Sequence, residues 1–478
     1  MRVSSLFFIV LIFTCHMSAH KLTLDSCRSM ALQNNRSIRM AEENIIGAEH
    51  LRKSAFASYL PGVDFSATYM YNQHEIALLG EDAKLPTMTF DATTQSYRYN
   101  ILTNPDTGEP ILNPTTGSVI PTEVAVIPKE AMTYDIHNVF AGAITLVQPI
   151  YMGGQIRAMN EISKYAEEIA ISMRNSKIQE VIFAVDEAFW NVVSLKAKRQ
   201  LAENYLTLVD TLMYNVTEML KEGVATESDK LTIEVRQNEA RIALSKVDNG
   251  LTLACMSLSQ LCGLPLDSEI EVINDAPFHK EMNQEIIQVE MTDVWRQRPD
   301  LQSLRSSIGI YEQKERLTRS EMLPKLAIVG AYTFQNPNVI AGFENRFGGG
   351  FSVGATLSVP IWHWGGNYNK LKSAQSQTTI QRLQLEDAEE KIELQVRQAT
   401  FRFEEAYKRY DLTLLNLDKA TENLRHAEIG FSEGVLTAND VILAQTAWLQ
   451  AHSENIDAEI EIQLCKVYLS KVLGITDY

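Results

Sequence analysis

The octapeptide EGVATESD spans residues 222–229, and a near copy, EGVLTAND, spans residues 433–440. The two copies share Glu-Gly-Val, a Thr and a final Asp, and they are offset by 211 positions (222 to 433). Glycine suits the left-handed position just past a helix C-terminus. Threonine suits the N-cap of a following helix, and an acidic residue three positions later completes a capping box. Each octapeptide therefore predicts the tip of a helical hairpin.

The offset of 211 extends well beyond the octapeptides. It also relates three outlying positions to their counterparts: Phe140 to Phe351, Pro149 to Pro360, and Gly263 to Gly474. Further upstream the offset becomes 263, which relates Leu60-Pro61 to Leu323-Pro324. The difference of 52 residues is an insertion in the first half. Self-similarity of this length indicates two copies of one structural unit.

Each copy is predicted to contain a helix, two strands and a long helical hairpin. The first repeat spans residues 20–263, with strands at about 62–72 and 139–148, an insertion at about 73–138 and a hairpin at 155–262. A connecting segment covers 264–290. The second repeat spans 291–474, with strands at about 325–334 and 351–359 and a hairpin at 367–473.

The outgoing helix of each hairpin is unusually long. Residues 155–222 contain no glycine or proline, and apolar residues recur there at three-four spacing. About 67 residues make a helix roughly 100 Å long, whereas the returning helix has about 36 residues. We expect the first helix of each copy, at about 24–58 or 291–322, to lie end to end with the returning helix beside the long one. The fold class is mainly α.

The strands alternate polar and apolar residues. Asp64, Ser66, Ser352, Thr356 and Ser358 are predicted on one face, and Phe65, Tyr69, Phe351 and Leu357 on the other. Two interpretations are possible. In one, the strands form a small soluble sheet packed on the helices, and in the other they are part of a transmembrane barrel. Four strands cannot close a barrel, so in the second case the barrel would be shared between protomers. Tyr151, Trp362 and Trp364 at the strand–helix junctions favour the barrel, where they would be interfacial aromatics, although core positions would also suit them. The insertion, which holds six of the fourteen prolines, would then be an extracellular loop.

The N-terminus predicts export. Arg2 precedes an apolar run at residues 6–13, which indicates a signal peptide at 1–19 and is too short to span a membrane. Lipid modification of Cys15 is an alternative. The net charge of −17 argues against nucleic acid as a partner. The remaining cysteines lack the paired spacing of a zinc or dithiol site and are expected to be isolated thiols, with one long-range bridge left open: Cys27, Cys255, Cys262 and Cys465.

Three classes of protein, namely an enzyme, a periplasmic adaptor and a surface adhesin, fit this sequence poorly. The nine histidines are scattered and no nucleophile, phosphate-loop or metal motif is present, so we expect no catalytic residue, metal or cofactor. A periplasmic adaptor would carry one long helical hairpin rather than two. A surface adhesin would have its barrel strands at the C-terminus, whereas here strands interrupt both halves.

Over essentially the whole mature chain, the sequence resembles the TolC-like outer-membrane efflux family. The motifs that carry the resemblance are RPDL (298–301), the LP before each outgoing strand, PIYMGG (149–154), PIWHWGG (360–366), both octapeptides, LCGLPL (261–266) and VLGI (472–475). The resemblance implies a homotrimer whose twelve-stranded barrel in outer-membrane lipid continues into a twelve-helix periplasmic tunnel. It also implies a periplasmic adaptor and an inner-membrane transporter of RND or ABC type as partners. The exported cargo, drugs and other toxic small molecules or proteins, stays open.

The resemblance also assigns roles to the hairpin tips. The implied adaptor-docking residues are Gly223, Val224, Ala225 and Thr226 in the first tip and Gly434, Val435, Leu436 and Thr437 in the second. Asp440 matches an acidic ring that constricts the periplasmic gate, with Asp229 the weaker candidate, and helix capping is the alternative role of both. A second acidic position of the family falls on Leu443, and a basic locking position falls on Leu436.

Overall fold

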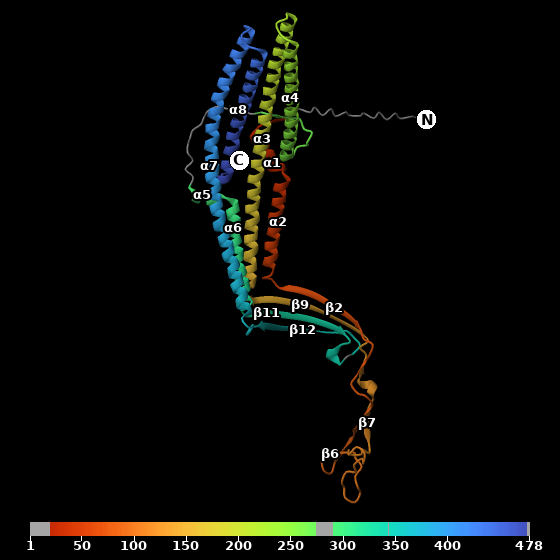
Figure 1. Cartoon of the computed structure of the whole chain (residues 1–478). Helices are drawn as coiled ribbons and strands as arrows, with labels where there is room; N and C mark the ends of the chain where they lie inside the picture. The colour runs from red at the N-terminus through yellow and green to blue at the C-terminus, as the bar shows by residue number, and fades with distance from the viewer. Residues whose placement is uncertain (1–19, 274–289, 343, 476–478) are drawn as a thin grey trace, which may run out of the picture. The chain divides into compact units, whose positions relative to one another are not determined.

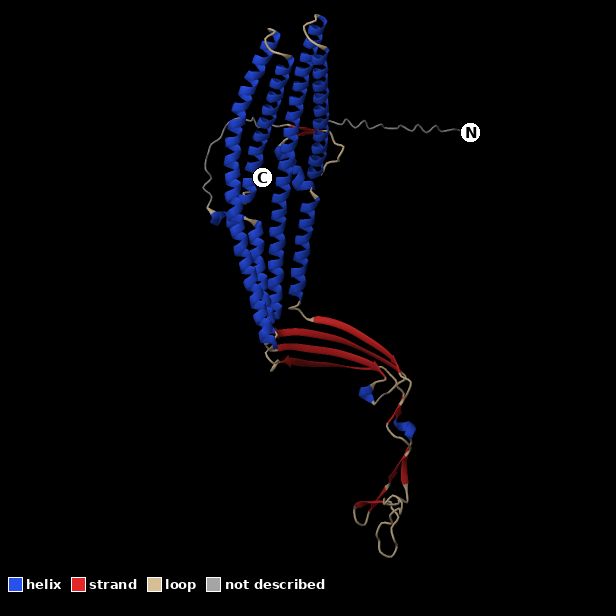
Figure 2. Cartoon of the chain, viewed as in Figure 1, coloured by secondary structure: helices blue, strands red, loops and turns tan. Residues whose placement is uncertain are grey.

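The computed structural model describes residues 20–273, 290–342 and 344–475. The predicted signal peptide and residues 274–289 of the predicted connecting segment lie outside the described residues. The chain divides into a helical unit and a strand unit (Figures 1 and 2). The helical unit comprises residues up to Ala55 together with Arg157–Thr318 and Tyr368–Tyr478, and the strand unit comprises Phe56–Ile156 and Arg319–Asn367. No helix in the described part of the chain combines the length and apolarity needed to cross a membrane.

Two long helices organise the helical unit. Helices α3 (Gln155–Lys221) and α7 (Gly366–Ser432) each have 67 residues, and each is followed by a returning helix, α4 (Glu227–Cys262) or α8 (Ala438–Leu473), of 36 residues. The returning helices end at Gly263 and Gly474, both in the left-handed conformation. The two halves thus repeat the same hairpin at the same lengths.

The first helix of each copy is broken in two, which corrects the expectation of continuous helices over 24–58 and 291–322. The observed pairs are α1 (Leu24–Asn34) with α2 (Arg36–Ala57), and α5 (Met291–Gln297) with α6 (Pro299–Ser320). Arg298 is extended, with ψ of 122°, because the following proline disfavours the helical conformation. Asn35 is extended as well, and its Oδ1 accepts the amide of Ser37 at 2.9 Å and so caps α2.

Side-chain contacts place the short helices beside the long ones. In the first half, Arg52 of α2 pairs with Glu167 of α3 at 2.6 Å, and Arg199 of α3 pairs with Asp248 of α4 at 2.6 Å. In the second half, two pairs do the same for α6 with α7 and for α7 with α8: Arg382–Glu312 at 2.7 Å and Arg409–Glu461 at 2.9 Å. This is the side-by-side arrangement that the helix lengths predict.

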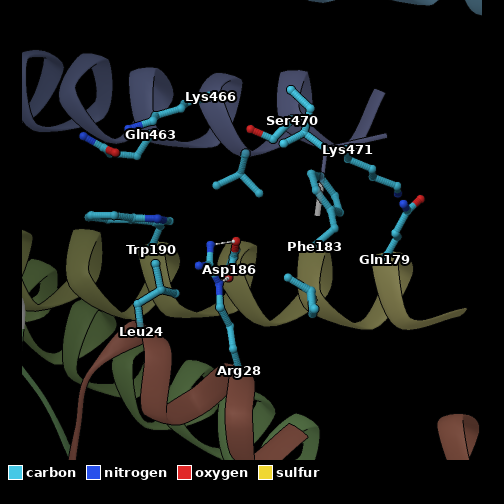
Figure 3. Close-up of a pocket in the computed structure, with 13 residues that line it drawn as sticks. Leu24, Arg28, Gln179, Phe183, Asp186, Trp190, Gln463, Lys466, Ser470 and Lys471 are labelled. Atoms are coloured by element: carbon cyan, nitrogen blue, oxygen red, sulfur yellow. Dashed lines mark hydrogen bonds and ion pairs between the residues drawn. The ribbon is translucent and has the colours of Figure 1, made fainter. Parts of the chain in front are cut away.

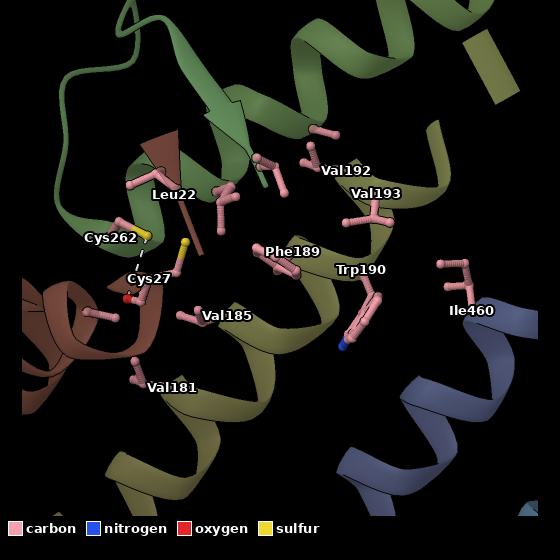
Figure 4. Packing of buried hydrophobic residues seen from close by; sticks show 14 of the residues in the cluster. Leu22, Cys27, Val181, Val185, Phe189, Trp190, Val192, Val193, Cys262 and Ile460 are labelled. Carbon is pink, nitrogen blue, oxygen red and sulfur yellow. Dashed lines mark hydrogen bonds between the residues drawn. The ribbon is translucent and has the colours of Figure 1, made fainter. Parts of the chain in front are cut away.

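A buried apolar cluster forms where α1, α3 and α4 meet (Figure 4). Phe189 and Val185 of α3 are at most 2% exposed, and strand β1 (His20–Leu22) pairs in parallel with β10 (Ile270–Val272) next to them. Cys27 and Cys262 both belong to this cluster and are fully buried. All four described cysteines are free thiols, as expected, but Cys27 and Cys262 are not isolated from each other, because the fold brings α1 and the end of α4 together. Cys255 and Cys465 are partly exposed thiols.

Two further apolar clusters hold the rest of the helical unit. One joins α5 and α6 to α7 and α8 through Val294, Leu301, Val396 and Val472. The other joins the two hairpins to each other near their tips, through Val209 and Val216 of α3, Ile233 of α4 and Val441 of α8. Each fully buried aliphatic side chain contributes about 1.5–3 kcal/mol, so these clusters fix both hairpins in one framework.

The strand unit contains a four-stranded antiparallel sheet in the order β12-β11-β9-β2. The strands are β2 (Gly62–Tyr71), β9 (Asn138–Met152), β11 (Lys325–Asn336) and β12 (Gly348–Ser358). The predicted strand at about 139–148 stops just before Pro149, whereas β9 continues through this proline to Met152. A register shift between Leu326 and Ala327 on β11 opposes this proline, and a bulge is where a residue without an amide hydrogen fits.

The insertion is built from short antiparallel pairs. Strand β3 (Ile76–Ala77) pairs with β8 (Thr133–Tyr134), β4 (Ala83–Pro86) with β7 (Val124–Ile127), and β5 (Met88–Asp91) with β6 (Ser96–Tyr99). A 3-10 turn, η1 (Lys129–Met132), precedes β8, and another, η2 (Val339–Ala341), lies between β11 and β12. The β3–β8 and β4–β7 pairs are nested in the sequence between β2 and β9, as in a long β-hairpin, and β5–β6 is a local pair inside them.

Candidate functional site

The two hairpin tips have nearly identical backbone geometry. Gly223 and Gly434 have φ of 73° and 74°, the left-handed values that favour glycine. In each tip the amide of the next residue reaches back to the outgoing helix, Val224 to the carbonyl of Met219 and Val435 to that of Gly430, both at 2.8 Å. The duplicated octapeptide therefore produces the same tight turn twice.

Both capping boxes predicted from the octapeptides are present. Asp229 accepts hydrogen bonds from the amide and the hydroxyl of Thr226 at 2.9 and 2.6 Å, and its own amide donates to that hydroxyl oxygen at 3.2 Å. The matching distances for Asp440 with Thr437 are 2.9, 2.7 and 3.3 Å. The hydrogen bonds from threonine hold the pKa of both carboxyl groups below the usual range, so both are ionised at neutral pH.

The apolar residues of the turns face solvent. Val224 is 71% exposed and Val435 is 79% exposed, although each lies next to a well-packed helix end. An exposed glutamate lies two residues before each valine in the sequence, at Glu222 and Glu433. Each turn therefore presents one exposed valine close in sequence to an exposed carboxylate.

The tips differ at one pair of contacting positions. In the second tip Leu436 packs on Gly430, where an added Cβ would come within 2.7 Å of the leucine Cδ1. In the first tip the same two positions are Met219 on the helix and Ala225 in the turn. Large and small residues have thus changed places between the tips. Leu436, where the sequence resemblance led us to expect a basic residue, serves here as a packing residue.

A groove of about 750 Å³ runs between the two hairpins near the tips. Its lining includes Tyr214 and Glu218 from α3, Glu428 and Phe431 from α7, and Gln445 from α8. Gln445 is 2% exposed and its Oε1 accepts no hydrogen bond in the described structure. Burial raises the pKa of the Glu428 carboxyl. Sequence reasoning missed this groove, because its lining comes from three helices that are adjacent only in the fold.

The sheet separates its residues into two faces. In the register of the four strands, Phe65, Ile144, Tyr332 and Phe351 form one continuous row. The adjacent row, on the opposite face, is Asp64, Thr145, Ala331 and Ser352. The next row on the apolar face, Val63, Leu146, Gly330 and Val353, is again apolar, whereas the next row on the polar face contains two valines, Val147 and Val329, between glycines.

The apolar face of the sheet is largely uncovered. In its first row the side chains are 66%, 44%, 49% and 82% exposed from Phe65 to Phe351. The outer edges of β2 and β12 pair with no other described strand. Within the strand unit nothing covers this face, and the two free edges leave backbone hydrogen-bonding groups without a strand partner.

The three predicted interfacial aromatics are exposed. Tyr151 lies near the end of β9 and is 48% exposed, and Trp362 and Trp364 follow β12 and are 71% and 88% exposed. The two indole rings contact each other edge to face, with centroids 5.9 Å apart. None of the three belongs to a described apolar core, which argues against ordinary core positions.

A pocket of about 310 Å³ lies in the helical unit between α1, α3 and α8 (Figure 3). Asp186 at its base is 1% exposed and accepts two hydrogen bonds from Arg28, at 2.7 and 2.6 Å. Burial raises the pKa of the Asp186 carboxyl, although the arginine opposes that rise. Lys466 and Lys471 line the opposite wall. The buried ion pair ties α1 to α3 and was not predicted from the sequence.

One group of metal-type ligands occurs in the insertion. Glu75, Asp135 and His137 bring their ligand atoms within 4.8 Å of one another. His137 Nδ1 is 2.7 Å from Asp135 Oδ1, which a hydrogen bond between the two side chains accounts for. Both carboxylates are exposed, and exposed acidic groups of this kind are common without a bound ion, so no role is assigned to the cluster.

Duplicated long hairpins with matching tips, joined to an open sheet with one apolar face, define a class of membrane-channel subunits. The family model described as "Outer membrane efflux protein" matches residues 127–264 and 292–475. The chain therefore belongs to the outer membrane efflux protein family. A comparison with curated protein sequences finds no significant match.

Solved structures share the fold over nearly the whole chain. CusC is 15% identical, with a TM-score of 0.72 over 94% of this chain and 92% of that one. The CmeC outer membrane channel of Campylobacter jejuni is 16% identical, with a TM-score of 0.70 over 94% and 85%. VceC of Vibrio cholerae is 13% identical, with a TM-score of 0.70 over 94% and 96%.

The family sets the general function. The protein is an outer-membrane efflux channel of tripartite pumps, located in the outer membrane with a helical periplasmic extension. The family is one of transport proteins rather than enzymes.

Proposed function

We propose that three copies of this chain assemble into one export duct. Their four-stranded sheets would close a twelve-stranded barrel in the outer membrane, and their helical hairpins would form a twelve-helix tunnel in the periplasm. The observation that carries the proposal is the sheet with an exposed apolar face and two unpaired edges. Closing the edges against neighbouring copies satisfies the backbone, and lipid covers the apolar face. The polar face lines the lumen, and Tyr151, Trp362 and Trp364 lie at the membrane interface.

The hairpin tips are the proposed docking site of a periplasmic adaptor. The contact residues are Gly223, Val224, Ala225 and Thr226, and Gly434, Val435, Leu436 and Thr437. The exposure of Val224 and Val435 and the groove between the hairpins support this assignment. Acidic residues near the tips, among them Glu222 and Glu433, favour a basic adaptor tip. The adaptor in turn links the channel to an inner-membrane transporter of RND or ABC type.

The periplasmic gate is proposed at Asp440, with Asp229 in a lesser role. Both carboxylates are engaged in capping boxes, so each residue stabilises a tip whether or not it also constricts the pore. Leu443, at the family's second acidic position, is 61% exposed. A single acidic ring followed by a leucine ring is therefore the arrangement that we propose for the aperture.

The assembly is tested on the full chain purified from outer membranes in detergent. The mass of the particle, after correction for bound detergent, should equal three chains, and planar bilayers containing it should show discrete conductance steps. A monomer or dimer as the largest stable species would contradict the proposed barrel.

The docking role is tested with Gly434→Pro. Proline fixes φ near −65°, whereas Gly434 has φ of 74° and donates its amide to Phe431 at 3.0 Å. We expect loss of efflux and of adaptor binding with normal trimer yield, and Ser432→Ala in the same tip should behave like the wild type. Loss of the trimer in Gly434→Pro would refute a role limited to docking.

The cargo is tested with a deletion strain. Its growth is compared with the wild type on antibiotics, bile salts and metals, and its secreted proteins are compared in parallel. Sensitivity to small molecules with unchanged secretion would assign the duct to small-molecule efflux, and the reverse result would assign it to protein export.

A further inference from the structure

Two cysteines from distant parts of the chain meet in the core of the helical unit. Cys27 lies on α1 and Cys262 is the last residue of α4, and both are fully buried. Cys262 Sγ is 3.7 Å from the carbonyl oxygen of Cys27, and the two sulfur atoms lie on the facing sides of their helices (Figure 4). Cys255, in contrast, packs against the same cluster but is only partly buried, and Cys465 is partly buried outside the cluster.

The surrounding backbone holds the two helix ends together without help from the sulfur atoms. Gly263, directly after Cys262, is so close to α1 that an added Cβ would lie 2.6 Å from Asn34 Cβ. Arg28, directly after Cys27, is fixed by its ion pair with Asp186. The pairing of β1 with β10 closes the same junction. The approach of Cys27 to Cys262 is therefore built into the fold.

The two thiols also interact with each other. The hydrogen bond between them lowers the pKa of the Cys262 thiol. The same hydrogen bond, together with burial, raises the pKa of the Cys27 thiol. These opposite shifts of the two pKa values show that the side chains are in contact in the folded chain, and a cysteine thiolate is the nucleophile in thiol–disulfide exchange.

We propose that Cys27 and Cys262 form an intramolecular disulfide in the exported protein, joining α1 to the end of α4. The helical part of an outer-membrane efflux protein lies in the periplasm, which is an oxidising compartment. The inference is independent of the proposed docking and gate residues, because it concerns only the junction of helices inside one chain.

The oxidant is a disulfide of an exported thiol–disulfide oxidoreductase. The Cys262 thiolate attacks one sulfur of that disulfide, so a mixed disulfide forms and the other sulfur leaves as a thiolate. The Cys27 thiolate then attacks Cys262 Sγ, which forms the intramolecular bond and releases the second sulfur of the oxidant. The two cysteine protons are lost, and the two electrons remain on the oxidant as a dithiol. Because both sulfur atoms are buried in the fold, the exchange precedes the final packing of α1 on α4.

The crosslink would be a feature of the first half only. At the offsets that relate the two copies, Cys27 corresponds to Glu290 and Cys262 to Leu473. The second junction is held instead by apolar packing around Leu301 and by Arg298, which donates to the carbonyl of Val472 at 3.1 Å. The disulfide would close a loop that contains the whole first sheet segment and hairpin, and such a long loop constrains the unfolded chain strongly.

The first test maps the cysteines of the wild-type protein. The full chain is expressed with its own export signal, the membranes are denatured directly in the presence of N-ethylmaleimide so that buried thiols also react, and the protein is digested without reductant for mass spectrometry. We expect the Cys27 and Cys262 peptides to be joined, two hydrogen masses lighter than the two thiol peptides together, with Cys255 and Cys465 alkylated. Alkylated Cys27 and Cys262 would overturn the proposal, and so would a bond from Cys27 to Cys255.

The second test measures the thermal unfolding of the purified channel with and without a phosphine reductant. The wild-type Tm should shift downward in reductant, whereas Cys27→Ala/Cys262→Ala should give one Tm under both conditions. Cys255→Ala is the matched control on the same helix and should keep the wild-type shift. An equal shift in the double variant, or none in the wild type, would contradict a bond between these two residues. The mapping result stands by itself if the double variant yields no folded protein.

Discussion

At the scale of single residues, the most informative difference between the two halves is that a large and a small residue have changed places between the two hairpin tips. The first tip places Met219 on the helix and Ala225 in the turn, and the second places Gly430 and Leu436 at the same positions. Because Leu436 occupies the space that a side chain at position 430 would need, each tip keeps one large and one small residue. The tips are therefore alternative solutions to the same packing problem.

We predict that Gly430→Met destabilises the second tip and that Leu436→Ala restores it. The single substitution forces a side chain into space held by Leu436, at a cost of about 1–3 kcal/mol for overpacking. The double variant recreates the pair of the first tip and also gains helix propensity at position 430. Thermal unfolding and efflux should both recover in the double variant. A single variant as stable as the wild type would show that the two positions are not coupled.

The buried ion pair of the helical unit gives a prediction about pH. Arg28→Met leaves the Asp186 carboxylate buried without its partner and should lower the free energy of unfolding by about 3–5 kcal/mol at pH 8. Burial already raises the pKa of Asp186, and loss of the arginine raises it further. In the variant the folded state then binds a proton at Asp186 more tightly than the unfolded chain does. The loss in free energy of unfolding, relative to the wild type, should therefore be larger at pH 8 than at pH 5.

The control for this prediction is Asp25→Asn. Asp25 also lies near Arg28, at 3.6 Å, but its side chain is 93% exposed. A surface pair of this kind contributes little, so this variant should unfold like the wild type at both pH values. A deficit in Arg28→Met that does not change with pH would contradict the assignment of the effect to Asp186.

At the scale of elements, the two faces of the sheet predict opposite responses at neighbouring positions. Phe351→Lys places a charge on the apolar face, whereas Ser352→Lys places it on the polar face. A lysine in the middle of the bilayer costs about 2–4 kcal/mol, and three copies would carry it. Folded trimer recovered from outer membranes should fall sharply for Phe351→Lys and stay near the wild-type amount for Ser352→Lys. Equal yields would mean that lipid does not cover the apolar face.

The elements themselves were largely accessible to sequence reasoning, because each has a strong local signal. The glycine, threonine and aspartate of the octapeptides specify a turn and a cap through contacts within a few residues. The break at Arg298 also has a local cause, the proline that follows it. The continuation of β9 past Pro149 has no local cause in the sequence, because it depends on a bulge in the pairing of β9 with β11. The groove at Gln445 and the meeting of Cys27 with Cys262 depend on packing between distant helices, which no local pattern records.

At the scale of the whole molecule, charge decides how the channel meets its partner. The chain carries a net charge of −17, and Glu222 and Glu433 stand beside the exposed valines of the tips. A basic adaptor tip would be attracted over a distance set by the ionic strength, about 10 Å at 0.1 M salt. The apolar contacts of Val224 and Val435 would not weaken in the same way, so the two contributions can be separated by salt.

We predict that adaptor affinity for the purified channel falls between 50 mM and 500 mM salt, and that Glu222→Gln/Glu433→Gln lowers both the low-salt affinity and the salt dependence. These two glutamates lie outside the capping boxes, so the turns should stay intact. Glu109→Gln/Glu123→Gln removes the same charge from the insertion and should leave binding unchanged. Titration calorimetry or surface plasmon resonance measures all three proteins. Affinity that is independent of salt would rule out the electrostatic contribution and assign docking to the exposed valines, because an attraction between acidic tips and a basic partner must weaken when mobile ions screen it.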